Sequence, residues 1–154
     1  MATPRWLWIG APLGVALGLG LFTLAYAKGL SYASDAPEAC VNCHIMREQY
    51  EGWLRGPHRE VATCNGCHVP HDFFGKWLSK GLNGFHHSKA FTLQNFHEPI
   101  RITPRNAAAL QANCLRCHGE FVAGLSAALH KGDEAGCTRC HAEVGHGSTA
   151  RERS

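Results

Sequence analysis

The longest apolar stretch of the chain lies near its start, over residues 6–27. It reads WLWIGAPLGVALGLGLFTLAYA and carries no charged side chain over 22 residues. About 20 apolar residues in a helix cross the hydrocarbon core of a bilayer, so this pattern predicts one membrane-spanning helix. The AYA triplet at its end is typical of a signal-peptide cleavage site, but the apolar run is longer than a usual signal core. We therefore expect an uncleaved anchor over residues 1–28 and a second domain over residues 29–154.

Three glycines recur every four residues within the predicted membrane helix, at Gly10, Gly14 and Gly18. This spacing lets a second helix approach closely, although glycine is also common in membrane helices for other reasons. Self-association of the chain through this face is therefore one of two interpretations.

A second pattern of apolar and polar positions predicts an amphipathic helix over about residues 72–92. Its apolar side chains and glycines cover one half of a helical surface, and polar side chains fill the other half. The apolar positions are 73, 74, 77, 78, 81, 82 and 85. An aromatic-rich face of this kind suits either the membrane interface or the face of a bound cofactor, and the pattern is compatible with both.

The eight cysteines fall into four Cys-x-x-Cys pairs, and a histidine follows each pair directly. The pairs are Cys40 and Cys43, Cys64 and Cys67, Cys114 and Cys117, and Cys137 and Cys140, and the histidines are His44, His68, His118 and His141. Cys-x-x-Cys-His is the attachment motif of a c-type haem, whose iron the histidine binds. Zinc ribbons and disulfide frameworks also pair cysteines, but neither requires a histidine after every pair. The sequence therefore predicts four covalently bound c-type haems, which implies export to a bacterial periplasm or its equivalent.

Four haems leave only about 32 residues of the second domain for each, which is too little protein for a separate apolar core. We therefore expect porphyrins to form much of the core of a mainly α fold with much loop and very little sheet. We also expect many of its helices to end in a Cys-x-x-Cys-His segment. The spacer between motifs has 19 residues in the first half and 18 in the second half, which indicates a repeat. The repeat predicts two dihaem modules, over about 40–71 and 114–146, joined by the helix over about 72–92. The net charge of +3, without a Lys/Arg run, does not favour a nucleic-acid partner.

Seven histidines lie outside the four motifs, and a histidine commonly serves as the second axial ligand of a haem. His58 and His130 occupy equivalent positions in the two modules, six and seven residues before the second motif of each. His146 lies five residues after His141, which is too close to cross its own haem easily. We predict His58 and His146 as iron ligands and His130 as a further candidate. Surface or hydrogen-bonded roles are expected for His71, His86 and His97.

Met46 follows His44 by two residues in CVNCHIM. A methionine can bind haem iron, but it is also an ordinary filler of apolar gaps. Because both side chains lie beside the same cysteine anchors, Met46 can reach the iron only by displacing His44. Displacement would leave the opposite face of the haem open unless another residue filled it. On spacing alone, a packing methionine is the favoured interpretation.

Lys80 and His87 lie seven residues apart on the predicted amphipathic helix and project from nearly the same side. A cationic lysine and a proton-accepting histidine at a membrane boundary would suit the headgroup of a quinol. The alternative is ordinary placement of polar groups at the interface.

These features together resemble the NapC/NirT family of membrane-anchored tetrahaem cytochrome c quinol dehydrogenases. The resemblance rests on the N-terminal anchor, on CVNCHIM, on GPH ahead of CNGCHVP, on the Lys/His helix and on the terminal CTRCHAEVGH. Within the family, the short chain is most similar to the small membrane subunits of cytochrome c nitrite reductases. The resemblance implies a single-pass protein of the bacterial inner membrane that oxidises menaquinol and passes electrons to a periplasmic multihaem nitrite reductase. Nitrite is reduced to ammonium by that partner. Another periplasmic reductase as partner, or a tethered electron carrier without a quinol site, are the alternatives.

The resemblance also implies roles for particular residues. Met46 would bind the first haem in place of His44, with the open face towards the quinol. Lys80 matches a lysine of the family's quinol site, whereas His87 stands where the family has an aspartate. The family also contains a haem whose distal ligand is a lysine of the partner. Carried over to the second haem, on Cys64, Cys67 and His68, this gives His58 to the fourth haem and His146 to the third.

Overall fold

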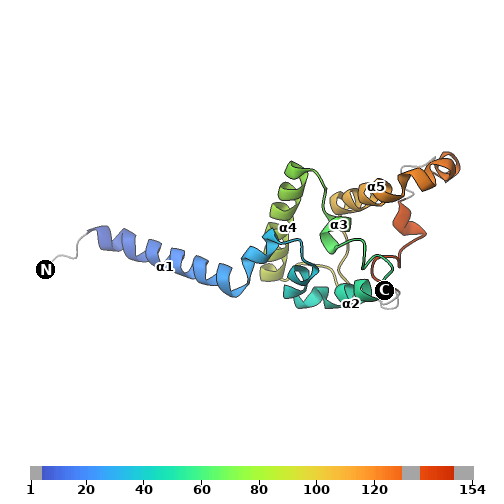
Figure 1. Ribbon diagram of the computed structural model, residues 1–154. Helices are drawn as coiled ribbons and strands as arrows, with labels where there is room; N and C mark the ends of the chain where they lie inside the picture. The colour runs from blue at the N-terminus through green and yellow to red at the C-terminus, as the bar shows by residue number, and fades with distance from the viewer. Residues whose placement is uncertain (1–4, 130–135, 148–154) are drawn as a thin grey trace. The chain divides into compact units, whose positions relative to one another are not determined.

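A computed structural model describes the backbone of residues 5–129 and 136–147. The chain divides into two compact units, Met1–Ser34 and Asp35–Ser154. Every element in the described ranges is helical and long loops connect several of them (Figure 1). The mainly α fold class that the sequence predicts is therefore confirmed.

The first unit contains α1 (Arg5–Tyr26) and the 3₁₀ turn η1 (Gly29–Ala33). Within α1, the stretch Trp6–Tyr26 has a mean hydropathy of 1.8 and is long and apolar enough to cross a membrane. A Cβ atom added to Gly10, Gly14 or Gly18 would have nothing within 4 Å. Self-association through this glycine face stays a prediction.

The first half of the second unit is built from short helices around the first two cysteine motifs. They are η2 (Pro37–Asn42), η3 (His44–Met46), α2 (Arg47–Arg55) and α3 (Cys64–His68). The chain leaves α2 at Gly56, ahead of a proline, because the residue before proline disfavours the helical backbone. The loop that follows is tied back to α2 by Trp53, whose Nε1 donates to the carbonyl oxygen of Ala62 at 2.9 Å. The Thr63 hydroxyl then caps α3 by accepting from the backbone N–H of Gly66 at 3.1 Å.

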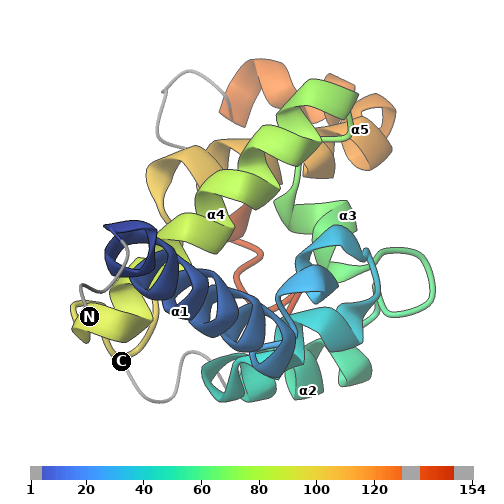
Figure 2. The same cartoon turned by 90° about the vertical axis from the view of Figure 1, so that its left-hand side faces the viewer.

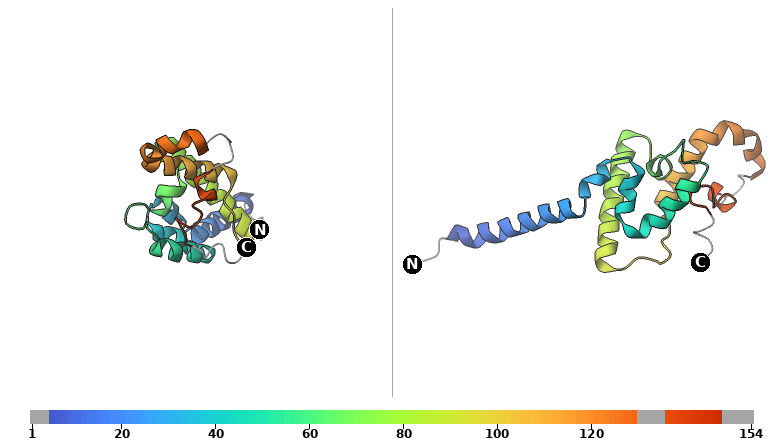
Figure 3. Two further views of the ribbon diagram at one scale, coloured as in Figure 1. Left: turned by 90° about the vertical axis from the view of Figure 1, so that its right-hand side faces the viewer. Right: turned by 60° about the horizontal axis from the view of Figure 1, so that its bottom comes forward.

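The amphipathic segment forms α4 (Phe73–Leu93), which the right-hand view of Figure 3 shows as one uninterrupted helix. Its start is fixed by Asp72, whose Oδ1 accepts from the backbone N–H of Gly75 at 2.6 Å. Its end is fixed by Gln94, whose left-handed φ of 52° closes the last turn. The observed helix lies within one residue, at each end, of the predicted range of about 72–92.

The second half continues with α5 (Pro104–Leu129) and the 3₁₀ turn η4 (Cys137–Arg139). The third cysteine motif lies inside α5, whereas the sequence led us to expect such motifs at helix ends. Alanines and leucines flank this motif on both sides, and their high helix propensity carries the helix through it.

Polar side chains connect these helices more than apolar ones do. The buried Asn113 of α5 donates through Nδ2 to the carbonyl oxygens of Cys67, at 2.8 Å, and Val69, at 2.9 Å. These bonds hold α3 against α5, and α3 lies between α2 and α5 in both Figure 1 and Figure 2. In the described part of the chain, Val69 is the one buried hydrophobic side chain. Protein atoms therefore supply very little apolar core, which fits the expectation that porphyrins supply it.

Candidate functional site

Two pairs of histidine rings face one another in the second unit. The ring centroids of His58 and His118 are 6.1 Å apart, and those of His68 and His146 are 5.9 Å apart. A metal–imidazole bond of about 2.0 Å, extended by about 1.2 Å from nitrogen to ring centre, puts two centroids about 6.4 Å apart across one iron. Both pairs therefore have the spacing of two axial ligands on a shared iron, and each pair contains one motif histidine.

Each non-motif histidine of these pairs is oriented by a backbone carbonyl. The Nδ1–H of His58 donates to the carbonyl oxygen of Val144 at 3.2 Å. The Nδ1–H of His146 donates to the carbonyl oxygen of Gln49 at 2.9 Å. A hydrogen bond of this kind fixes the tautomer and leaves Nε2 with its lone pair for a metal. Burial, and then the neighbouring His146, lower the pKa of His68 to about 4, so this ring stays in its neutral, metal-binding form.

These ring positions favour a different pairing from the one that the resemblance implied. His58 lies beside the motif histidine of the third haem rather than the fourth. His146 lies beside that of the second haem rather than the third. The C-terminal segment reaches α2 because Gly52 is buried and has no side chain: a Cβ atom there would overlap the carbonyl oxygen of His146. Spacing along the sequence cannot reveal this crossing.

The remaining candidate ligands have other surroundings. His71 bonds the carbonyl oxygen of Gly66 through Nε2 at 3.0 Å. His86 packs edge-on against Phe85, with ring centroids 5.5 Å apart, and His97 is exposed. Among the described residues, no ring contact joins His141 to another histidine. The candidate ligand at position 130 lies outside the described residues.

His44 and Met46 are the first and last residues of the short η3 turn and differ in their environment. His44 is exposed, and its Nδ1 accepts from the Arg47 guanidinium at 3.4 Å. Met46 is half-buried. The motif histidine of the first haem is therefore the more solvent-facing of the two candidate ligands.

The attachment cysteines of successive motifs lie close together. The thiols of Cys40 and Cys64 are hydrogen-bonded, and so are those of Cys114 and Cys137. Cys67 and Cys117 are near enough to influence one another electrostatically. No disulfide joins any of the eight cysteines. In the described ranges, no group of three or more His, Cys, Asp or Glu is gathered as a zinc site requires. The interactions between cysteines thus place the four motifs in the spatial order 1–2–3–4.

Cys43 and Cys140 are the two predicted haem anchors that take part in none of these contacts between motifs. Both are exposed, and each directly follows a 3₁₀ turn, Cys43 after η2 and Cys140 after η4. They belong to the first and last motifs, which each have a neighbouring motif on one side only. The structure therefore does not gather all eight cysteines together, and the role of Cys43 and Cys140 as anchors stays a prediction from the motif spacing.

A cluster of charges that we call the Asp35 cluster lies beside the first motif. Asp35 Oδ1 accepts from Lys80 Nζ at 2.8 Å and from Asn65 Nδ2 at 3.0 Å, and Oδ2 pairs with Lys76 Nζ. The side chain of Lys80 is only 6% exposed. Its Nζ also lies 5.6 Å from the centre of the Trp77 ring. The hydrogen bonds from the two lysines hold the pKa of Asp35 well below its usual range.

The Asp35 cluster is within electrostatic reach of the first haem-attachment cysteine. A hydrogen bond with Cys64 lowers the pKa of the Cys40 thiol to about 7, and the positive charge of Lys80 acts in the same direction. Sequence reasoning identified Lys80 but missed Asp35. Asp35 lies 45 residues before Lys80, and no periodic pattern connects the two positions.

His87 lies two turns beyond Lys80 on α4, a rise of about 10.5 Å along the helix. It lines a pocket of about 420 Å³ between α4 and the start of α5. The other lining residues are Asn83, His86, Lys89, Ala90, Asn95, Thr103, Arg105 and Asn106. Burial, and then the neighbouring His86, lower the pKa of His87 from its ordinary value. Lys80 and His87 therefore have different surroundings, because Lys80 is held by an acid and His87 lines a pocket.

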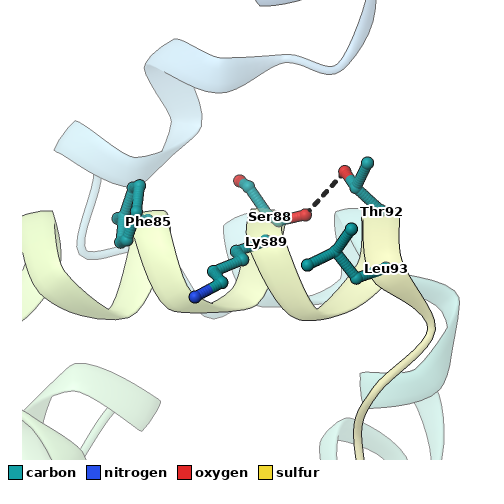
Figure 4. Close-up of a pocket in the computed structure, with 5 residues that line it drawn as sticks. All are labelled: Phe85, Ser88, Lys89, Thr92 and Leu93. Atoms are coloured by element: carbon teal, nitrogen blue, oxygen red, sulfur yellow. Dashed lines mark hydrogen bonds between the residues drawn. The ribbon is translucent and has the colours of Figure 1, made fainter.

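A second hollow of about 300 Å³ lies on the surface of α4 and is shown in Figure 4. Its lining residues are Phe85, Ser88, Lys89, Thr92 and Leu93. All five come from one helix, and the Thr92 hydroxyl donates to the carbonyl oxygen of Ser88 at 2.8 Å. This feature is therefore a shallow surface groove and not an enclosed site.

Comparison with known proteins shows what this arrangement belongs to. Residues 3–152 match the model of the NapC/NirT cytochrome c family, N-terminal region. The chain belongs to the NapC/NirT cytochrome c family. A NapC/NirT cytochrome carries covalently bound haem c, so the predicted attachment chemistry of the four motifs agrees with the family.

Two curated relatives are similar to this NapC/NirT chain. It is 40% identical over 108 residues to the cytochrome c-type protein NrfH of Wolinella succinogenes, covering 70% of this chain and 61% of the relative. It is 31% identical over 109 residues to the cytochrome c nitrite reductase subunit NrfH of Nitratidesulfovibrio vulgaris, covering 71% and 64%. The chain thus spans about three fifths of the length of these relatives.

One solved structure is similar to this chain over most of the length of both chains. It is a crystal structure of the cytochrome c nitrite reductase NrfHA complex bound to the HQNO inhibitor. The TM-score is 0.67 at 27% identity, and the match covers 90% of this chain and 92% of the other.

Proposed function

We propose that this protein is a membrane-anchored quinol dehydrogenase that oxidises menaquinol and delivers the electrons to a periplasmic nitrite reductase. The relatives named NrfH and the solved NrfHA complex support this partner. The apolar helix α1 would anchor the chain in the inner membrane. Covalent haem attachment would put the second unit on the periplasmic side.

Four haems c would be held by the eight motif cysteines, and the paired rings suggest the axial ligands of two of them. His68 and His146 would bind the second iron, and His118 and His58 the third. The half-buried position of Met46 supports Met46 in place of His44 at the first iron. His141 would bind the fourth iron. When bound, each haem takes up and releases one electron at a time.

This ligand assignment changes which haem would receive a ligand from the partner. The expected site for a partner lysine was the second haem, but His146 lies beside the motif histidine of that haem. Among the described histidines, none makes a ring contact with His141. We therefore assign the partner's ligand to the fourth haem, which is also last in the spatial order of the motifs.

The observation that carries the quinol site is the buried Lys80 beside the first motif. An ammonium group in this position offers a fixed positive charge to the oxygen of a quinol as that oxygen loses its proton. His87 would accept a proton, because its lowered pKa keeps the imidazole neutral and basic near pH 7. Quinol oxidation releases two protons, so two polar groups on one helix suit the reaction.

Substitution of Lys80 tests this function. In the purified full chain, Lys80→Leu should lower the rate of menaquinol-driven haem reduction by about tenfold or more, equivalent to about 1.4 kcal/mol of transition-state stabilisation. Reduction by dithionite and haem content should be unchanged, because neither needs the quinol site. Lys76→Leu is the matched control, since Lys76 pairs with the same carboxylate but is more exposed, at 30%. An equal loss in quinol-driven and dithionite-driven reduction would make the role of Lys80 structural.

A further inference from the structure

Asp35 collects donors from two different helices. Lys76 and Lys80 approach it from α4, and Asn65 approaches it from α3, inside the second cysteine motif. Asp35 itself lies five residues before Cys40, at the start of the segment that carries the first motif. One carboxylate therefore connects α4 to the attachment segments of the first two haems.

A buried ammonium group requires a nearby anion, because removing an unpaired charge from water is strongly unfavourable. Lys80 is buried, and Asp35 is in direct contact with it at 2.8 Å. Glu38 is the other acid near Cys40, but its carboxylate accepts a hydrogen bond from the Tyr50 hydroxyl at 3.3 Å. Asp35 is thus the acid that holds the Lys80 ammonium in its position.

We propose that Asp35 is a positioning residue of the quinol site, whose carboxylate fixes the Lys80 ammonium beside the first haem-attachment segment. This inference rests on the proposed function and adds to it a residue that neither the motifs nor the spacing singled out. Asp35 acts through Lys80 and takes up no proton itself, since its two lysine partners keep it ionised. The proton acceptor is therefore a different group.

The test compares Asp35→Asn with Asp35→Glu in the full chain, with a menaquinol analogue as reductant. Asp35→Asn keeps the shape of the side chain but removes its charge, so kcat/KM for the quinol should fall by about tenfold. Asp35→Glu keeps the charge and should recover most of the loss. Haem content and dithionite reduction should match the unmodified protein in both variants. Glu60→Gln is the control, because Glu60 is 81% exposed and pairs with Arg59 at the surface.

A double variant decides whether Asp35 acts through Lys80. Asp35→Asn combined with Lys80→Leu should be no slower than Lys80→Leu alone, because both substitutions remove the same interaction. Additive losses, normal quinol kinetics in Asp35→Asn, or loss of haem from that variant would each overturn the positioning role. If Lys80→Leu still impairs quinol oxidation, the proposed function survives that result. Absence of quinol oxidation in the unmodified full chain would instead overturn the proposed function.

Discussion

Under the proposed function, His87 would replace an aspartate of the family as proton acceptor and would do so in a different pH range. The resemblance places an aspartate at this position, and both side chains can accept a proton. An unperturbed aspartate titrates near about 3.9 and an unperturbed histidine near about 6.5. Partial burial and the neighbouring His86 lower the pKa of His87, so its imidazole becomes neutral at a lower pH than an unperturbed histidine does.

A change in the pH dependence of quinol oxidation should therefore follow His87→Asp. The acid limb of the rate profile should lie below about pH 6.5 in the unmodified protein and should move further down in the variant, because a carboxylate stays basic to lower pH. Steady-state rates measured between about pH 4 and 8 would show the shift, because aspartate and histidine side chains titrate within roughly this range. The exposed His97→Asp substitution should leave the limb where it is. An unmoved limb in His87→Asp would exclude His87 as the proton acceptor.

Single residues differ in how far their roles can be predicted from the sequence. The motif cysteines and histidines follow from local spacing, and so do His58 and His146 as candidate ligands. Their pairing does not, because it depends on which segments meet in space. Asp35 was missed for the same reason: its partners lie 30 to 45 residues away in the sequence. A lone aspartate in a short loop has no periodicity that could mark it.

Among the elements, the contact between α2 and the C-terminal segment leaves the least room for an added side chain. Gly52 is buried under the backbone of His146, and Gln49, one turn earlier on α2, receives the His146 ring. A β-carbon at position 52 would meet a backbone carbonyl, which cannot rotate away as a side chain could. The glycine therefore sets how closely this segment approaches the helix.

Gly52→Ala should displace His146 and weaken its approach to His68. We expect about one of the haems to lose its low-spin signal in electron paramagnetic resonance spectra, and the melting temperature to fall, since overpacking costs about 1–3 kcal/mol. Gly145→Ala is a suitable control, because a Cβ there has nothing within 4 Å. Matching spectra for the two variants would argue against His146 as an iron ligand.

The elements themselves were predictable to different degrees. The helix over about 72–92 was visible in the sequence because its apolar half repeats at helical spacing. The passage of α5 through the third motif was not predicted, because the motifs were expected to end helices. Helix-forming residues in fact continue on both sides of the third motif. Helical propensity and an attachment motif are compatible in one segment, as Cys64–His68 in α3 also shows.

At the scale of the whole molecule, the attachment segments form a series. The cysteines of the first and second motifs are hydrogen-bonded, as are those of the third and fourth, and the second and third motifs are near enough to influence one another electrostatically. A series transmits electrons only if every member works, because no described contact joins the first motif directly to the third or fourth. Under the proposed function, the third haem would therefore be a point at which electron flow can be interrupted without touching the quinol site.

His58→Ala should interrupt the series at the third haem. Loss of the distal ring should add about one high-spin haem to the spectrum and slow delivery to the partner, while quinol should still reduce the earlier haems. Optical and electron paramagnetic resonance spectra of the purified chain report the first effect, and stopped-flow reduction reports the second. His71→Ala provides the comparison, because the His71 ring bonds a carbonyl oxygen and faces no motif histidine. A high-spin gain of the same size in both variants would contradict the pairing of His58 with His118.

The contact between Cys40 and Cys64 also bears on how the protein is made. The two thiols belong to different motifs, yet they are hydrogen-bonded to one another. In an oxidising compartment, thiols in contact form disulfides, and here such a bond would join two motifs and remove an anchor from each. Cys114 and Cys137 pose the same hazard at the other end of the series. Under the proposed function, maturation would therefore have to keep these thiols reduced until the haems are attached.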